Sequence, residues 1–347
     1  MNTKSMFQHA QLHDQLIGFV RAFAGGAESR VDTMPAQLST RRYHRVATEG
    51  SPRSCVVMEL PEDARNESDA RMPFLNVHRY LSGQHFPVPK IYRAEVANGF
   101  IALEDLGDET LEAAVSHCRS EREIRALYRK AVSLIARLQE MGSNHPDPEC
   151  LAFGRRFDYT LLRWELAHFR EWLLEEGRGI RLTDAESAVV ESQFDWLAKA
   201  LADSPPVLVH RDFQSRNLMV VRRGGEPQIS VIDFQDALLG PSVYDLVALL
   251  RDSYLSLSDG LVEELVTSFA VATGRNVMEI TNLFNLQTVQ RKLKDSGRFV
   301  FIDRKRGMPN FLAAIPLSLR YVRDAIVQVP ELRPLHEILG RHVPELR

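Results

Sequence analysis

The chain has 347 residues, 44% of them hydrophobic and 26% charged, which fits a globular protein large enough for two domains. Its formal net charge of −3 argues against nucleic-acid and anionic-membrane partners, and no run approaches the roughly 18 apolar residues of a membrane span. Three scattered cysteines without a C-x-x-C pair, and an N-terminal segment without the apolar stretch of a signal peptide, lead us to expect a cytoplasmic protein.

The first hundred residues predict a small domain that mixes helices, strands and loops. Apolar residues at helical spacing over 7–23 predict a helix. The β-branched run at 54–60 predicts a strand, and a short helix is predicted over 73–81. A further strand starts at 99 and ends near Glu104, before Gly107 breaks the pattern.

Amphipathic helices dominate the rest of the chain. Apolar stripes predict helices over 121–141 and 158–176. Thr183, followed three residues later by Glu186, predicts the capping box of a third helix over 183–201.

Short strands interrupt this helical region at 207–210 and 217–222, and a Gly-Gly turn leads into a third strand at 229–234. Every segment after 241 is predicted to be helical, including 244–255, 260–273 and 311–327. These elements predict an α+β protein with a small mixed domain at 1–107 and a larger, mainly helical domain at 108–347.

Two short strings carry the chemistry, H-R-D-F-Q-S-R-N at 210–217 and I-D-F-Q-D at 232–236. Asp212 follows an apolar strand and can accept a hydroxyl proton, while Asn217 and Asp233 offer the hard oxygen ligands that suit Mg²⁺. The predicted hairpin returns the second string beside the first, as two ligands of one cation require. A polar loop with Asx turns is the alternative, but the combination favours metal-assisted phosphoryl transfer.

On these strings the chain resembles the aminoglycoside phosphotransferase/choline kinase-like family, a branch of the protein-kinase fold, from about residue 38 to 327. Longer strings at 157–172 and 290–299 are most similar to bacterial anomeric kinases of N-acetylmuramate and N-acetylglucosamine. The resemblance implies a two-lobed protein-kinase-like fold, with a β-rich N-terminal lobe that binds ATP and a helical C-terminal catalytic lobe. It implies that Asp212 is the catalytic base and that Asn217 and Asp233 bind Mg²⁺.

Other residues in and near the two strings are expected to support the reaction or the loop. Arg216 is either a surface arginine beside a turn or a catalytic cation that offsets charge on the transferring phosphoryl group, and we favour the second role. His210 and Arg211 are expected to brace the loop, and Asp245 to tie it to the following helix. The basic run at 303–307 is expected to be a solvated loop.

The nucleotide side departs from the protein-kinase pattern, because the expected glycine-rich turn carries no glycine. We expect Ser39, Thr40 and Arg41 in this turn to contact the phosphates, although a hairpin with a basic rim is the alternative. The strand lysine that would hold the α- and β-phosphates aligns with Met58, which cannot pair with phosphate. Either Arg41 or Arg42 supplies the missing charge, Mg²⁺ carries more of it, or activity has been lost.

The adenine contact is predicted at the end of the strand that starts at 99. By the resemblance, the backbone of Leu103, Glu104, Asp105 and Leu106 forms the hinge that hydrogen-bonds adenine.

Four residues are candidates for the acceptor site. Glu165 suits sugar hydroxyls and Trp172 suits the apolar face of a sugar, although a solvated glutamate and a core tryptophan are equally good interpretations. Gln235 either reaches the substrate or shapes its loop. Arg251 either binds an acidic substrate group or pairs with Asp252.

The sequence therefore predicts an enzyme that uses ATP and Mg²⁺ to phosphorylate a small hydroxylated molecule, and an amino sugar is the favoured acceptor. The first alternative keeps the fold but changes the acceptor to an aminoglycoside, a choline-like amine or another metabolite. The second alternative is a nucleotide-binding pseudokinase, motivated by Met58 and the glycine-free turn.

Overall fold

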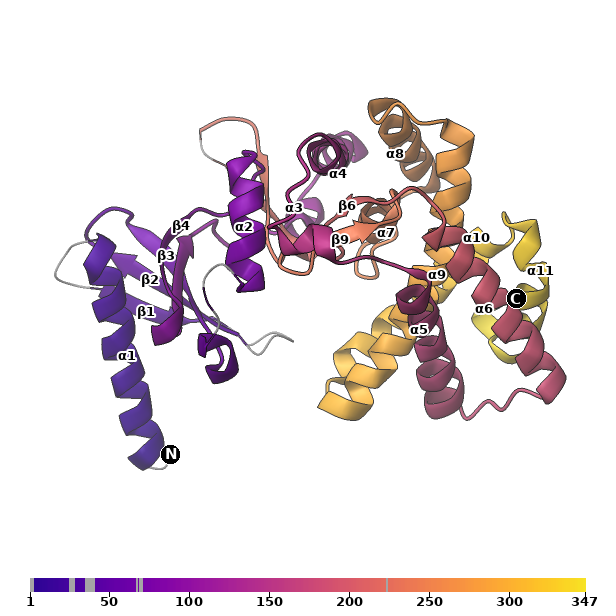
Figure 1. Cartoon of the computed structure of the whole chain (residues 1–347), viewed down its shortest axis with the longest axis horizontal. Helices are drawn as coiled ribbons and strands as arrows, with labels where there is room; N and C mark the ends of the chain where they lie inside the picture. The colour runs from indigo at the N-terminus through magenta and orange to yellow at the C-terminus, as the bar shows by residue number, and fades with distance from the viewer. Residues whose placement is uncertain (1–2, 25–28, 35–40, 67, 69–70, 223) are drawn as a thin grey trace. The chain divides into compact units, whose positions relative to one another are not determined.

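The computed structural model describes residues 3–24, 29–34, 41–66, 68, 71–222 and 224–347, and Figure 1 labels most of its helices and strands. The chain divides into two compact units. The first comprises Met1–Glu109 and Met219–Gln235, and the second comprises Thr110–Leu218 and Asp236–Arg347. The chain therefore passes from one unit to the other three times. The domain limits predicted at 1–107 and 108–347 remain a prediction.

A five-stranded antiparallel sheet with the strand order β1-β2-β3-β5-β4 forms the centre of the first unit. Its strands are β1 (Ser29–Thr33), β2 (Arg42–Thr48), β3 (Ser54–Glu59), β4 (Ile91–Glu95) and β5 (Phe100–Glu104). The strands predicted at 54–60 and after 99 are thus confirmed, and the structure shows that they pair with each other. Met58 of β3 lies opposite Tyr43 of β2 and Ile101 of β5.

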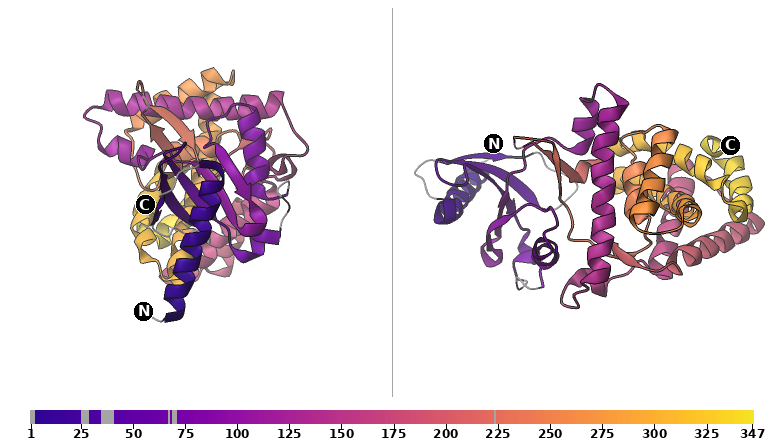
Figure 2. Two further views of the ribbon diagram at one scale, coloured as in Figure 1. Left: turned by 90° about the vertical axis from the view of Figure 1, so that its left-hand side faces the viewer. Right: turned by 90° about the horizontal axis from the view of Figure 1, so that it is seen from above.

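Helix α1 (Thr3–Ala24) lies across one face of this sheet, as Figure 2 shows. Its buried residues Leu16, Phe19 and Val20 recur at the spacing of one helical face. They form a core with buried residues of three strands: Val46, Cys55, Val57, Phe100 and Ala102. The helix predicted at 7–23 is confirmed, and its stripe explains why it packs here.

Helix α2 (Pro73–Gly83) and the hairpin of β7 (Leu218–Val221) and β8 (Gln228–Val231) complete the first unit, together with the 3₁₀ turns η1 (Glu62–Asn66) and η2 (Val96–Asn98). The backbone N–H of Val231 donates to the carbonyl of Pro87 at 2.7 Å. Phe234, just beyond the hairpin, stacks on Phe74 of α2 with the ring centroids 4.9 Å apart. A segment from late in the chain therefore belongs to the core of the first unit.

Helices make up most of the second unit. The α-helices are α3 (Leu111–Ser116), α4 (Glu121–Asn144), α5 (Tyr159–Phe169), α6 (Asp184–Ala202), α7 (Tyr244–Leu250), α8 (Asp259–Ala272), α9 (Val277–Arg306), α10 (Ile315–Ile326) and α11 (Arg333–His342). A π-helix, η4 (Arg170–Gly177), continues α5, and β6 (Val207–Val209) pairs with β9 (Leu238–Gly240). The 3₁₀ turns are η3 (Leu151–Gly154), η5 (Ser215–Asn217), η6 (Pro309–Ala314), η7 (Pro330–Leu332) and η8 (Pro344–Leu346).

Local sequence signals explain several of these helices. The capping box predicted at Thr183 is confirmed: the Thr183 side chain accepts from the N–H of Glu186, whose side chain accepts from the N–H of Thr183. The helix predicted at 158–176 continues as the π-helix η4 after Phe169. The helix predicted at 244–255 ends at Leu250, because Asp252 accepts hydrogen bonds from loop groups instead of continuing the helix.

The 30-residue helix α9 corrects one expectation. Residues 303–306 were predicted to lie in a solvated loop, but they form the last turn of α9, which ends at Gly307 with a φ of 65°. Three basic residues in that turn face the negative end of the helix dipole, which favours a helical conformation there. None of the helices that the structure describes combines the length and the apolar character that a membrane crossing requires.

Candidate active site

The loop after β6 carries Asp212 and Asn217 in the second unit. The amide of Asn217 donates to the carbonyl of Asp212 at 2.8 Å, and the backbone N–H of Gln214 donates to the same carbonyl at 2.8 Å. These bonds fix the orientation of Asn217, so that its amide oxygen remains available as a ligand. The Asp212 side chain is 39% exposed and is therefore accessible to a substrate. We call residues 210–217 the catalytic loop.

Two buried carboxylates hold the catalytic loop by its backbone. Asp245 of α7 accepts from the N–H groups of His210 at 2.6 Å and Arg211 at 2.9 Å. Burial raises the pKa of Asp245, although the side chain of His210 and both backbone N–H groups act in the opposite direction. Asp252 accepts from the backbone N–H of Ser215 at 2.9 Å. The structural role predicted for Asp245 is confirmed, whereas the role of Asp252 was not predicted.

Arg216 is occupied by partners within the second unit. Its guanidinium donates to both carboxylate oxygens of Glu112, at 2.7 and 3.0 Å, and lies 3.6 Å from the ring centroid of Tyr254. The hydrogen bond that Arg216 donates to Glu112 raises the pKa of Arg216, with burial acting in the opposite direction. The structure thus gives Arg216 a bidentate partner, and its catalytic role stays a prediction.

Asp233 belongs to the first unit, where it adopts a left-handed φ of 66°. Gln235 donates to its Oδ1 at 2.9 Å, so the Gln235 side chain shapes this loop. Burial raises the pKa of Tyr43, Arg41 lowers it, and Asp233 raises it further, so both charges lie near the phenol. The guanidinium of Arg41 also lies 5.9 Å from the ring centroid of Phe74. The first unit therefore places Arg41 in the neighbourhood of Asp233.

The structure describes only some of the other residues considered for nucleotide binding. Ser39 and Thr40 lie outside the described residues. Met58 is 0% exposed inside the sheet, whereas Arg42 is exposed. Leu103 is buried in β5.

The predicted hinge is tied to the sheet through the side chain of Asp105. Arg45 donates to both oxygens of this carboxylate, at 2.9 and 3.1 Å, and Ser54 donates to one of them. Burial opposes ionisation of Asp105, but the bonds from Ser54, the N–H of Gly107 and Arg45 lower its pKa below the ordinary value. The side chain of Asp105 is thus engaged by protein groups, and a nucleotide contact at Glu104, Asp105 or Leu106 remains a prediction for their backbone.

Asn217 of the second unit and Asp233 of the first each offer an oxygen ligand that suits a divalent cation, and their joint role as Mg²⁺ ligands stays a prediction. An amide oxygen and a carboxylate are hard ligands, and Mg²⁺ is commonly held by only one or two protein groups together with substrate phosphates. Among the described residues, no group of three or more His, Cys, Asp or Glu side chains forms a self-sufficient metal site. The chemistry of each residue therefore fits a cation that is shared with a nucleotide.

The predicted acceptor residues all lie in the second unit except Gln235. Glu165 is 2% exposed and accepts from Gln290 of α9 at 2.8 Å. Trp172 is buried, and its ring packs edge-on against the ring of Phe301 with the ring centroids 4.9 Å apart. Arg251 lies 3.4 Å from Asp259, so the pairing with Asp252 that was the alternative is wrong: Asp252 serves the catalytic loop.

Aromatic and basic residues on α5 and α9 were missed in the sequence. Trp164 is 56% exposed and stacks on His168 at 5.3 Å. Arg298 is half-buried over the ring of Phe301 at 4.8 Å, and it makes no hydrogen bond or ion pair in the part of the chain that the structure describes. Arg291, also on α9, reaches the catalytic loop itself: its guanidinium donates to the carbonyl of Arg211 at 3.0 Å. In the sequence, these two arginines stand out only as members of the string at 290–299, which resembles the sugar kinases.

The α+β fold and the loop that presents Asp212 and Asn217 define a phosphotransferase with a protein-kinase-like fold. A model of the phosphotransferase enzyme family matches residues 32–280, and the chain belongs to this family. A relative from Pseudomonas aeruginosa, named N-acetylmuramate/N-acetylglucosamine kinase, is 32% identical over 328 residues, which cover 90% of this chain and 91% of the relative.

Solved structures share the fold at lower identity. The choline kinase LicA from Streptococcus pneumoniae superposes with a TM-score of 0.59 at 13% identity, over 91% of this chain and 99% of that one. The ADP-bound aminoglycoside phosphotransferase APH(2'')-Ib gives a TM-score of 0.54 at 15% identity, over 89% of this chain and 98% of that one. The resemblance stated from the sequence and the fold class are both confirmed.

Proposed function

We propose that this phosphotransferase moves the γ-phosphoryl group of ATP to a hydroxyl of an amino sugar, with C1 of N-acetylmuramate or N-acetylglucosamine as the site of transfer. The observation that carries the acceptor is the 32% identity to an N-acetylmuramate/N-acetylglucosamine kinase over nine tenths of both chains. ATP as the donor is supported by family membership and by the ADP-bound relative of the same fold.

Asp212 acts as the general base in this proposal. The acceptor hydroxyl gives its proton to a carboxylate oxygen of Asp212 while its oxygen forms a bond to the γ-phosphorus. The bond from that phosphorus to the β,γ-bridging oxygen breaks, and ADP leaves with the electron pair. Mg²⁺ held by Asn217 and Asp233 would neutralise charge on the β- and γ-phosphate oxygens. Arg41 is the protein cation that we assign to the phosphates in place of the absent strand lysine, because it lies near Asp233.

Arg298 is a better candidate than Arg251 for the residue that binds an acidic group of the acceptor. A half-buried guanidinium without a carboxylate at hydrogen-bond distance is poorly compensated, and binding an anion would relieve that cost. Burial and the neighbouring charges of Arg306 and Arg211 lower the pKa of Arg298, and the charge of Asp212 acts in the opposite direction. Arg251 already has Asp259 as a partner and lies over the ring of Tyr321 at 5.1 Å. N-acetylmuramate has a carboxylate for such a site, and N-acetylglucosamine lacks one.

A substrate panel tests the proposal. The purified chain is incubated with ATP and Mg²⁺ and with N-acetylmuramate, N-acetylglucosamine, choline, ethanolamine or an aminoglycoside, and phosphorylated product is measured by ³¹P NMR. We expect product with the two amino sugars, and we expect Asp212→Asn to remove it while ATP binding by calorimetry stays close to that of the parent chain. Product with choline or an aminoglycoside alone would support the first alternative. ATP binding without any product would support the pseudokinase.

A further inference from the structure

The backbone immediately before the proposed base has an unfavourable conformation. Arg211 has a φ of 80°, in the left-handed region that residues with a side chain seldom occupy. Such a conformation persists only when surrounding contacts determine it. Because Asp212 is the next residue, any relaxation of Arg211 would redirect the Asp212 carboxylate.

The strained residue is held from both sides by buried charges. Its N–H donates to Asp245 at 2.9 Å, as described above. Its carbonyl accepts from Nη1 of Arg291 at 3.0 Å, across 80 residues of sequence. The carbonyl contact comes from α9, so this helix and α7 together fix the conformation of Arg211.

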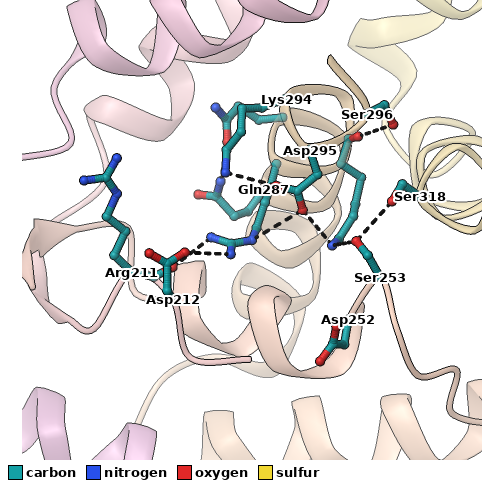
Figure 3. A network of polar contacts seen from close by, with 12 residues as sticks. Arg211, Asp212, Asp252, Ser253, Gln287, Lys294, Asp295, Ser296 and Ser318 are labelled. Carbon is teal, nitrogen blue, oxygen red and sulfur yellow. Dashed lines mark hydrogen bonds and ion pairs between the residues drawn. The ribbon is translucent and has the colours of Figure 1, made fainter. Parts of the chain in front are cut away.

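The same guanidinium also approaches the carboxylate of Asp212. Nη2 of Arg291 lies 3.7 Å from Oδ1 of Asp212, and the Arg291 side chain is 0% exposed. Within the described ranges, Nη2 and Nε of Arg291 are buried and have no hydrogen-bond partner. Figure 3 shows Asp212 at the left of the polar network and Asp295 near its middle. A small rotation of Asp212 would therefore complete a charged hydrogen bond to Nη2.

The charges around Arg291 favour this contact. Asp295 is the nearest other carboxylate, 3.9 Å from Nε, but it is shared with Lys292 at 2.8 Å and Lys294 at 3.0 Å. The ring centroid of Tyr244 lies 4.7 Å from the guanidinium. Burial disfavours the charge, yet Tyr244, Asp295, Asp212 and Glu165 together raise the pKa of Arg291 above its ordinary value. The buried carboxylate of Asp295 is thus shared by three cations, and Asp212 and Glu165 supply further negative charge.

We propose that Arg291 is a positioning residue for phosphoryl transfer. It holds the Arg211 carbonyl and attracts the Asp212 carboxylate, so that the base keeps one orientation toward the acceptor hydroxyl. The inference rests on the proposed function, because it assigns meaning to the orientation of Asp212. It predicts an effect on the chemical step and not on the binding of either substrate.

The test compares Arg291→Met and Arg291→Lys with Lys292→Met in the full chain. Lys292 is a matched control, since it is also a buried cation of α9 bound to Asp295, but its Nζ donates to Ser253 at 3.0 Å and not to the catalytic loop. We expect Arg291→Met to lower kcat about 100-fold with KM for ATP and acceptor nearly unchanged, the cost of a misplaced reacting group. Arg291→Lys keeps the charge and should recover part of kcat, and Lys292→Met should keep kcat near the parent value.

Two controls make the outcome decisive. Thermal unfolding of each variant defines the temperature at which all of them are folded. In the Asp212→Asn background, Arg291→Met should leave ATP binding by calorimetry and any residual turnover unchanged, because the residue that it positions is gone. The inference is overturned if Arg291→Met and Lys292→Met lower kcat equally, or if Arg291→Met changes KM alone. Where Arg291→Met does not fold, full kcat in Arg291→Lys overturns it.

Different results would refute the proposed function itself. In that case the parent chain phosphorylates no amino sugar, or Asp212→Asn remains active. Loss of activity in Asp212→Asn together with full activity in Arg291→Met would retain the proposed function and remove only the inference.

Discussion

His168 makes the second unit sensitive to acid. The side chain is 6% exposed, lies between Trp164 at 5.3 Å and Phe301 at 5.4 Å, and has no hydrogen-bond partner at Nε2 in the described part of the chain. Burial, followed by the charges of Arg298 and Lys294, lowers the pKa of His168 from 6.5 to about 4. The folded protein therefore holds this imidazole neutral at a pH where the unfolded chain protonates it.

The sign and size of the effect follow from these two pKa values. Because the folded-state value is the lower one, the contribution of His168 is fully present above pH 6.5 and is lost as the pH falls toward 4. The difference of about 2.5 units corresponds to about 3.4 kcal/mol in total, at about 1.36 kcal/mol per unit. Between pH 7.5 and pH 5 the same linkage relation gives a loss of about 2 kcal/mol.

Urea unfolding of the parent chain and of His168→Phe measures this loss. Phenylalanine preserves the ring between its aromatic neighbours and removes the titrating group. The free energy of unfolding of the variant, relative to the parent, should rise by about 2 kcal/mol between pH 7.5 and pH 5. Taking this difference cancels the titration of other groups, such as Asp245. A difference that stays constant across this pH range would refute the burial argument.

Two further predictions concern substrate binding. Arg41→Gln should raise KM for ATP about tenfold through loss of a charged phosphate contact, while Arg42→Gln, the exposed control, should leave that KM unchanged. Equal rises of KM for ATP in the two variants would contradict the assignment of Arg41 to the phosphates. Arg298→Gln should raise KM for N-acetylmuramate about tenfold but not that for N-acetylglucosamine, with Arg251→Gln as the control, and an equal rise for both sugars would exclude carboxylate recognition by Arg298.

The fold was predictable where short-range patterns determine it. Helices α1, α4 and α6 carry apolar stripes or caps that depend on residues three or four apart. Helix α9 was not predicted as one element, because it is buried on several faces and carries Arg291, Lys292 and Asp295 at buried positions. Such a helix has no simple division into an apolar and a polar face, so its periodicity is weak.

Residues of the site were likewise predictable where contacts within one loop place them, and not where contacts between distant segments place them. Asp212 and Asn217 lie five residues apart in one loop, and their hydrogen bond is a property of that loop. Arg291 acts on the loop from 80 residues away, and only the packing of α9 places it there. The environment of Arg251 was misjudged for a related reason: its predicted neighbour Asp252 is drawn toward Ser215 by the fold.

The three passages of the chain between its units have a consequence for biosynthesis. A ribosome that has released residues 1–109 has not yet supplied residues 219–235, which carry β8 and Phe234. Until then, Phe74 of α2 lacks the aromatic ring on which it stacks, and the carbonyl of Pro87 lacks the N–H of Val231. The first unit therefore finishes folding only after residues 110–218, about half of the second unit, have been synthesised, and cutting the gene at codon 109 would not yield two self-sufficient fragments.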